Sequence, residues 1–569
     1  MKYGSDLIVD AMLRYGIEYA ALNPGSSFRG LHDSLVNYGR NRPEIIECPH
    51  EEIAVAIAHG YAKTTGRPMA AIVHDVVGLL HGSMAIYYAY LDRAPVLVLG
   101  ATGPMEMARR RPHIDWIHTA VAQGGAVRDY TKWDYQPFGD ADVVESFARA
   151  YRVALTDPQG PVYLCYDAAW QEDPLASEPE IPAPERIMPT RLHPDPAALD
   201  TLAGWLLEAE MPVFIAELAG RRPENAGLLV QLAEELGAAV VDTGERFNFP
   251  SDHPLNLTGG QGVIEGADLV VGLDVRDLSG EVADVDRVRR STSSRLAPGC
   301  RLVEIGYGDV AIRSWSQEFQ RLQPVDLSIL GDSGLALAGL VERCRGRARR
   351  RAERSQRIAD RHRELREEWA AQASAAADRS PIATAHLASA IWREIRESDW
   401  VLTANTLRDW TRRLWDFDGP GRHPGNSLGT ATQIGISLGV ALAHRGSGRL
   451  VVDIQPDGDL LFDPGALWVA SHHRIPMLVV MYNNRAYYND WEHQILIARQ
   501  RGRDEEMAYV GQELADPAPD FAMLARSFGW HAEGPVESPK DLAPALARAR
   551  RAVLEEGKPA LVDVITEPR

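Results

Sequence analysis

The sequence predicts an α/β fold built from three doubly wound parallel-sheet domains. Short apolar runs alternate with helical patterns along the whole chain, which is typical of parallel strands joined by crossover helices. In addition, 569 residues are too many for one hydrophobic core, and three domains are the natural expectation at this length.

The first domain is expected over residues 1–175. Its apolar runs at 19–22, 70–73, 95–99 and 162–164 are short, rich in Ala, Val and Leu, and separated by helical patterns. Runs of this kind predict buried parallel strands. A stretch rich in Pro and Glu, residues 174–196, follows and is interpreted as an interdomain linker.

Two further domains are expected over residues 190–345 and 380–569. The strands predicted for them are 213–216, 239–241, 268–272 and 302–305 in the second domain, and 400–403, 450–454, 477–482 and 560–564 in the third. Between them, residues 345–379 are dense in Arg, Glu and Ala. Because the two charges balance, this segment indicates a solvated connecting helix rather than a basic binding surface.

Composition excludes several classes of partner and location. A formal net charge of −19 argues against nucleic-acid binding, which needs a basic surface. The four cysteines have neither metal-ligand nor disulfide spacing, so a reducing cytoplasm is expected. No apolar run is long enough to cross a membrane, and the first residues lack a signal-peptide core.

Two polar residues follow neighbouring predicted strands of the third domain. Asp457 closes the apolar run 450–454, and Asn484 follows the run 477–482, 27 residues after Asp457. Either residue alone would be an ordinary turn or strand end, but parallel strands end at the same edge of a sheet. Their oxygens, with the backbone carbonyl of Ala486, suit Mg²⁺ that carries a diphosphate. The sequence therefore predicts a metal site of Asp457, Asn484 and Ala486.

These motifs resemble those of thiamin-diphosphate enzymes, in the branch of acetolactate synthase and benzoylformate decarboxylase. The signature of that family is Gly-Asp-Gly followed by Asn-Asn, and this chain departs from it only in carrying Pro456 at the first Gly. A second motif, Pro49-His50-Glu51-Glu52 before Gly60-Tyr61-Ala62, also matches. The resemblance covers nearly the whole chain and implies pyrimidine-binding, central and diphosphate-binding domains, in that order.

The resemblance assigns the activation of the cofactor to Glu51, nine residues before Gly60. A carboxyl against the aminopyrimidine favours its imino tautomer, which removes the thiazolium proton and makes the nucleophilic ylid. Glu52 is the fallback for this role. The alternative is that both residues are only acids at a helix N-terminus.

Further site residues are implied by the same resemblance. His74 falls where benzoylformate decarboxylase has a loop histidine; it is either a proton donor near neutral pH or a histidine bonded to backbone. His113 is near a polar active-site position of some relatives and is a third catalytic candidate. The expected cofactor contacts are Pro24, Gly25, Glu51, Gly458, Asp459, Leu460, Asn484 and Ala486, and the expected substrate pocket is Ser26, Ser27, His74, Tyr487, Tyr488 and Trp491. The aromatic residues of that pocket are equally suited to a subunit interface.

The activity implied is that of a carbon–carbon bond lyase or carboligase that uses thiamin diphosphate and Mg²⁺. The ylid would add to a 2-oxo acid, CO₂ would leave, and the enaminol would pass to a second carbonyl, as in acetolactate synthase. The alternatives are a simple 2-oxo acid decarboxylase, a hydrolase that cleaves 1,2-diones, and a homologue that binds the cofactor without catalysis. FAD is not favoured, because Asp274 would place negative charge near a nucleotide phosphate. A homodimer or homotetramer with active sites between subunits is implied.

Overall fold

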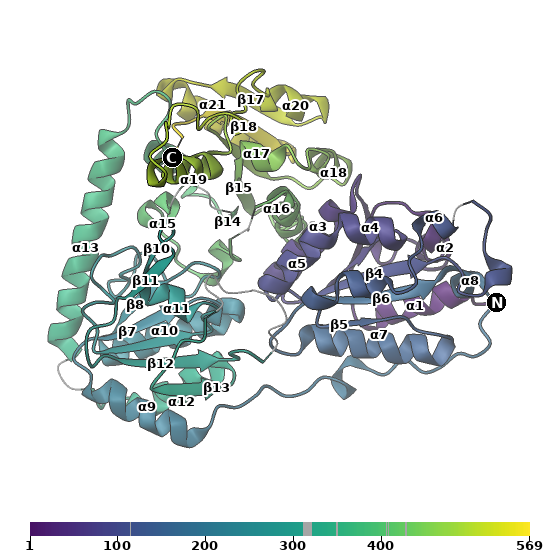
Figure 1. Cartoon of the computed structure of the whole chain (residues 1–569), viewed down its shortest axis with the longest axis horizontal. Helices are drawn as coiled ribbons and strands as arrows, with labels where there is room; N and C mark the ends of the chain where they lie inside the picture. Colours follow the sequence, from purple (N-terminus) through teal and green to yellow (C-terminus); the bar gives the residue numbers. More distant parts are fainter. Residues whose placement is uncertain are drawn as a thin grey trace.

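The computed structural model of the chain contains three parallel sheets with helices packed on them (Figure 1). It describes residues 1–568, except 114, 311–320, 349–350, 405–406, 408 and 427–428, and it does not describe the side chain of residue 116. The three α/β domains confirm the predicted fold class. Within the described residues, no helix has the length and apolar character needed to span a bilayer.

The first sheet has the strand order β2-β1-β3-β4-β6-β5, and all its pairs are parallel. One face packs on α1 and α7, and the other packs on α3 and α5. The four central strands correspond to the predicted ones, whereas the two edge strands were not predicted. The bounds are β1 Tyr19–Leu22, β2 Glu44–Glu47, β3 Met69–Ile72, β4 Val96–Thr102, β5 Trp133–Tyr135, β6 Val162–Asp167, α1 Gly4–Arg14, α3 Glu51–Thr65, α4 Asp75–His81, α5 Ser83–Leu91, α6 Asp115–His118 and α7 Asp140–Leu155.

The second sheet has the order β13-β12-β9-β7-β8, again parallel, and an antiparallel hairpin, β10–β11, lies outside it. Helices α9, α10 and α12 belong to its core. The bounds are β7 Pro212–Ala216, β8 Ala239–Asp242, β9 Leu269–Leu273, β10 Ala283–Asp286, β11 Ser291–Ser294, β12 Arg301–Gly306, β13 Leu327–Leu330, α9 Pro196–Glu208, α10 Pro223–Leu236 and α12 Ser333–Cys344.

A long helix, α13 (Arg351–Ala375), connects the second domain to the third along one side of the molecule (Figure 1). The charge pattern predicted a solvated helix, but one side of α13 is buried. Ile358 and Leu365 are buried in the core of the central domain. Arg354 is also buried, and its guanidinium donates to the carbonyls of Gly237 and Ala209 at 2.9 and 2.7 Å. The helix is therefore a packed part of the central domain.

The third sheet has the order β14-β15-β16-β18-β17 and is parallel throughout. Its strands β15 and β16 end beside one another, because Pro456 pairs with Tyr482. The bounds are β14 Trp400–Ala404, β15 Leu450–Pro456, β16 Leu478–Asn483, β17 His531–Val536, β18 Ala560–Ile565, α16 Thr432–Ala443, α17 Asp457–Leu460, α18 Ala466–His472, α19 Tyr488–Gln500, α20 Phe521–Ser527 and α21 Pro539–Glu556.

Helices α3 and α16 join the first and third domains through glycines. A Cβ on Gly60 would lie 2.0 Å from the carbonyl oxygen of Ile436, and one on Gly439 would lie 2.1 Å from that of Ile57. Only glycine permits backbones to approach this closely. The two helices also share one hydrophobic core, so the N-terminus of α3 has a defined position against the third domain.

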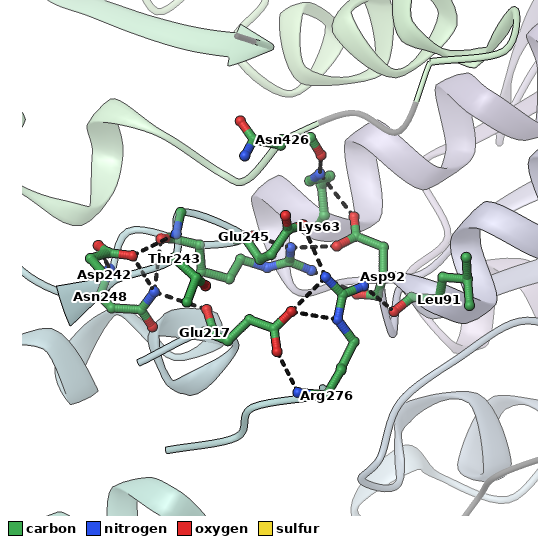
Figure 2. A network of polar contacts seen from close by, with 12 residues as sticks. Lys63, Leu91, Asp92, Glu217, Asp242, Thr243, Glu245, Asn248, Arg276 and Asn426 are labelled. Atoms are coloured by element: carbon green, nitrogen blue, oxygen red, sulfur yellow. Dashed lines mark hydrogen bonds and ion pairs between the residues drawn. The ribbon is translucent and has the colours of Figure 1, made fainter. Parts of the chain in front are cut away.

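A buried polar network ties all three domains together (Figure 2). Its centre is Asp92 of the first domain, whose carboxylate lies 2.6 Å from His59 Nε2, 2.8 Å from Lys63 Nζ and 2.5 Å from Arg246 Nη1 of the central domain. Lys63 also donates to the carbonyl of Asn426 in the third domain at 2.8 Å. Burial opposes ionisation of Asp92, but Arg246 and Lys63 outweigh it and hold the pKa of this carboxyl well below its usual range.

Candidate functional site

The carboxylate and the carboxamide predicted to bind metal do converge. Asp457 begins α17 directly after β15, and Asn484 follows the last residue of β16. Oδ2 of Asp457 and Oδ1 of Asn484 lie 3.3 and 3.0 Å from one backbone nitrogen, that of Ala486. Asp457 is buried, and burial raises its pKa to about 6 against the backbone N–H groups that lower it. Two oxygen ligands therefore meet at the carboxyl edge of the third sheet.

The departure of this motif at Pro456 does not disturb the loop. Pro456 has φ −69° and ψ 146°, and the proline ring restricts φ to about −65°. The residue is also the last of β15, still paired in parallel with Tyr482. Asp457 therefore keeps its place at the end of the strand.

A cavity of about 390 Å³ opens beside these ligands. Gly458 lines this cavity. A Cβ at this position would lie 2.4 Å from Cε1 of Tyr487, so there is no room for a larger residue. Two of the residues expected from the third domain do not line the cavity: Leu460 is fully buried, and the ring of Trp491 lies against Tyr488 and Tyr509. The lining residues are Thr430, Pro456, Asp457, Gly458, Asp459, Phe462, Tyr482, Asn484, Ala486, Tyr487, Tyr488, Asn489 and Asp490.

Thr430 lies in a strained turn at the edge of this cavity. Gly429, Thr430 and Ala431 have φ of 77°, 53° and 74° in succession, and this region is costly for the two that are not glycine. The turn is held from two sides. The N–H of Ala431 donates to Asp459 Oδ1 at 2.8 Å, and the hydroxyl of Tyr88 in the first domain donates to Thr430 Oγ1 at 2.9 Å.

Glu51 is the first residue of α3, and its carboxylate is buried. Its Oε2 lies 3.2 Å from Nδ1 of His81, and a Cβ on Gly78 would come within 2.7 Å of its Oε1. Glu51 therefore packs against α4 of its own domain. It is not among the residues that line the cavity beside Asp457.

The loop before α4 brings several expected residues together. Ser27 Oγ lies 2.8 Å from His74 Nδ1, and a Cβ on Gly25 would lie 2.6 Å from the His74 ring. Desolvation and the charge of His118 lower the pKa of His74, so its imidazole is neutral at neutral pH. The backbone carbonyl of Ser26 accepts a hydrogen bond from Arg111 Nη1 at 3.4 Å. Pro24 is exposed.

His113 is exposed and has φ of 72°. The ring that contacts His74 is instead that of His118, the last residue of α6, with 5.0 Å between the ring centroids. The only sequence signal for His118 is its place in the same short segment as His113. Tertiary structure was needed to distinguish the two.

The residue expected to disfavour FAD, Asp274, follows β9 at the carboxyl edge of the central sheet and is buried. Ser333 Oγ donates to it at 2.5 Å, and the guanidinium groups of Arg93 and Arg221 lie 3.7 and 3.5 Å away. The positive groups at this edge are therefore paired with a carboxylate of the chain.

Comparisons with known proteins agree with this arrangement. Residues 2–123 match the family model "Thiamine pyrophosphate enzyme, N-terminal TPP binding domain", and residues 406–564 match its C-terminal counterpart. A benzoylformate decarboxylase of Pseudomonas aeruginosa is 25% identical over 100% of this chain and 99% of its own length. A probable chloroplastic acetolactate synthase of Oryza sativa subsp. japonica is 24% identical over 93% of this chain and 78% of its own.

A solved structure shares the fold along the whole chain. The benzoylformate decarboxylase of Polynucleobacter necessarius superposes with a TM-score of 0.79 at 19% identity, covering 100% of this chain and 99% of that one. The two family models match the domains that carry Glu51 on one side and Asp457 and Asn484 on the other. The chain is thus an enzyme of the thiamin-diphosphate-dependent family.

Proposed function

We propose that this enzyme is a lyase or carboligase that uses thiamin diphosphate and Mg²⁺ to act on a 2-oxo acid. The observation that carries the proposal is the meeting of Asp457 Oδ2 and Asn484 Oδ1 at the backbone nitrogen of Ala486, beside a 390 Å³ cavity. The names of the relatives, which include decarboxylases and acetolactate synthases, support the reaction class.

Asp457, Asn484 and the carbonyl of Ala486 would hold Mg²⁺, which prefers oxygen ligands. In the described part of the chain, no basic side chain forms an ion pair with Asp457, although its carboxylate is buried. A bound cation would stabilise the ionised carboxylate that burial disfavours. The donor set and its charge therefore fit a magnesium ion.

Glu51 would exchange a proton with the aminopyrimidine of a cofactor whose diphosphate is held by another copy of the chain. Within one chain, Glu51 does not line the cavity beside Asp457, and its partner His81 is half exposed. An isologous dimer would bring the two half-sites together. The dimer is then the smallest active unit, and a tetramer is a pair of such dimers.

When bound, thiamin diphosphate supplies a nucleophilic carbon that also accepts the electron pair released with CO₂. His74 would then accept or return a proton at the substrate. Its neutral state at neutral pH makes it a competent base, and Ser27, hydrogen-bonded to Nδ1, would orient the ring.

FAD is left out of the proposal. Arg93 and Arg221 are the cations next to Asp274 at the carboxyl edge of the central sheet, and both already pair with Asp274. A nucleotide phosphate there would have to displace these ion pairs.

A decarboxylase that releases an aldehyde, or a hydrolase that cleaves a 1,2-dione, would use the same residues of the proposed site with a different second step.

The test is a turnover assay of the full chain with thiamin diphosphate and Mg²⁺, supplied with pyruvate or with benzoylformate. CO₂ and products are followed together, with and without an aldehyde acceptor. CO₂ with a hydroxyketone identifies a carboligase, and CO₂ with free aldehyde identifies a decarboxylase. Tight cofactor binding without CO₂ from either acid would contradict 2-oxo acid decarboxylation of these two donors and favour dione cleavage. Asp457→Ala serves as the inactive control.

A further inference from the structure

A second cluster of metal-ligating side chains lies where the first and third domains meet. His50 and Glu52 come from the start of α3, and Asp463 comes from the loop after α17. One ligand atom from each of the three residues lies within 4.8 Å of the others. None of the three belongs to the Asp457 cavity.

One oxygen of each carboxylate in this cluster has no hydrogen-bond partner among the described residues. Asp463 is 6% exposed, and its Oδ2 has no hydrogen-bond partner among the described residues; the same holds for the buried Oε1 of Glu52. The imidazole of His50 is close to this pair, with Nδ1 3.6 Å from Asp463 Oδ1. The cluster is therefore a buried site with excess negative charge, which is costly unless it is neutralised.

The electrostatics of Glu52 show the same imbalance. Burial, followed by the charges of Asp463 and Asp459, raises the pKa of Glu52 to about 8. Burial and Asp459 also raise the pKa of Asp463, and His50 opposes them. Asp459 itself has partners, since it accepts from the Ala431 N–H and from Gln455 Nε2.

A proton on Glu52 or a bound cation is able to neutralise such a pair, and the geometry argues only against a proton shared between the two carboxyl groups. A proton shared by two carboxyl groups needs oxygens about 2.6 Å apart, but within the described structure no hydrogen bond joins Glu52 to Asp463. Ligands at 2.0–2.2 Å around a tetrahedral zinc ion lie about 3.4 Å apart. The observed spacing, with an upper limit of 4.8 Å, closes to that value by a shift of at most about 1.4 Å.

We propose that His50, Glu52 and Asp463 bind one Zn²⁺ ion, with water as the fourth ligand. An imidazole with two carboxylates suits zinc and other first-row transition metals, whereas Mg²⁺ prefers oxygen alone. The two carboxylates match the charge of the ion. The affinity for Zn²⁺ exceeds that for Mn²⁺, as the order of divalent-metal stabilities requires.

Two features oppose the ion and set limits on its affinity. The N-terminus of α3 carries a partial positive charge, and His50 Nδ1 already accepts a hydrogen bond from the Glu52 N–H, although a long one of 3.3 Å. The two carboxylates and the field of Asp459 outweigh this opposition. The ion would pin the first turn of α3, which carries Glu51, to the loop after α17.

The test uses the full chain, stripped of metal by a chelator and free of thiamin diphosphate. Zn²⁺, Mn²⁺ and Mg²⁺ are each titrated by calorimetry, and bound metal is counted by elemental analysis. The expected result is one Zn²⁺ per chain, bound at least about 100-fold more weakly by Asp463→Asn and by Glu52→Gln. Glu47→Gln, at an exposed acid three residues before His50, and Asp457→Asn keep the affinity for Zn²⁺. The latter variant separates this site from the proposed magnesium site.

The melting temperature provides a second readout. Zn²⁺ raises it in the wild type and in Asp457→Asn, because a ligand that binds only the native state stabilises it, and leaves Asp463→Asn unchanged. The proposal is overturned if the wild type takes up no zinc, if Asp463→Asn and Glu52→Gln both retain it, or if Asp457→Asn abolishes it. If Asp463→Asn does not fold, Glu52→Gln carries the test alone.

Discussion

The backbone N–H of Ala486 is the point at which two separate strand ends are joined. It lies within hydrogen-bond distance of Asp457 from β15 and of Asn484 from β16. This arrangement follows from the parallel pairing of the two strands, which places both carboxyl ends at one edge. The chemistry of the proposed metal site thus depends on a few side chains placed by backbone geometry.

Replacing Asp457 with Ala removes the one charged ligand of the proposed metal site. We expect thiamin diphosphate and Mg²⁺ to bind at least about 100-fold more weakly, since a charged ligand to the metal is lost. Calorimetric titration of the cofactor in the presence of Mg²⁺ measures this. Asp541→Asn, an exposed acid of α21, is the matched control and should bind as the wild type does. Equal affinity in Asp457→Ala would remove Asp457 from the site.

At the scale of elements, the crossing of α3 and α16 holds the first and third domains of the chain together. The contact is between backbones, so it tolerates no side chain at Gly60 or Gly439. Because α3 begins with Glu51 and Asp459 bonds the residue before α16, this crossing fixes how the two half-sites of one chain are placed relative to each other. Small residues here serve packing rather than flexibility.

The variant Gly439→Ala tests this crossing. The new methyl group would meet the carbonyl of Ile57 at 2.1 Å, and we expect a loss of about 1–3 kcal/mol in the free energy of unfolding. Gly227→Ala in α10 is the matched control, because a Cβ there meets nothing within 4 Å; it should gain up to about 1 kcal/mol from helix propensity. Denaturant titration measures both, and an unchanged Gly439→Ala would contradict the close packing.

The strands that the sequence predicted include the central ones of every sheet, together with two edge strands, β8 and β14. β4, β9 and β16 are buried on both faces and therefore appear as continuous apolar runs. The strands that were not predicted are edges or isolated pairs: β2, β5, β13, β17 and the β10–β11 hairpin. None of these is buried along its whole length as β4, β9 and β16 are. β17 also contains Gly534-Pro535, a pair that is typical of a turn.

The site divides in the same way. Asp457, Asn484 and Glu51 were identified because they lie in contiguous motifs. His118 and the Glu52–Asp463 pair were not, because their contacts join segments far apart in the chain. Glu52 was considered only as a substitute for Glu51, and its contact with the third domain has no local sequence signal.

At the scale of the molecule, buried polar contacts hold the three domains in one arrangement. The network around Asp92 joins all three (Figure 2), and His423 adds a second link. Its Nδ1 lies 2.8 Å from the carbonyl of Leu402 in the third domain, and its Nε2 lies 3.2 Å from that of Gly244 in the central domain. Stability is therefore expected to depend on the charge state of these links.

His423 predicts a loss of stability at acidic pH. Burial lowers its pKa from 6.5 to about 4, so on acidification the unfolded chain takes up the proton first. The contribution of the neutral His423 ring to the free energy of unfolding is full above pH 6.5. It is lost as the pH falls toward 4, by about 3 kcal/mol in total. Urea titrations from pH 7 to pH 4 should show a shallower decline in His423→Gln than in the wild type. Parallel declines would contradict the neutral state of the buried ring.

The proposed dimer makes a prediction about mixed variants. Inactive Glu51→Gln chains and inactive Asp457→Ala chains are mixed and allowed to exchange subunits. If each site takes Glu51 from one chain and Asp457 from the other, half of the dimers are mixed and each has one intact site, so about 25% of wild-type activity returns. If both residues act within one chain, no intact site forms and activity stays absent.

The central claim is that Glu51 activates thiamin diphosphate for proton loss. It is tested most directly without any substrate, by measuring exchange of the C2 proton of the bound cofactor with deuterated solvent. We expect exchange to be faster on the wild type than in free solution, and to fall by about 10²–10⁴-fold in Glu51→Gln. The control Glu47→Gln should exchange as fast as the wild type, and all three proteins should bind the cofactor. Exchange in Glu51→Gln as fast as in the wild type would contradict the account.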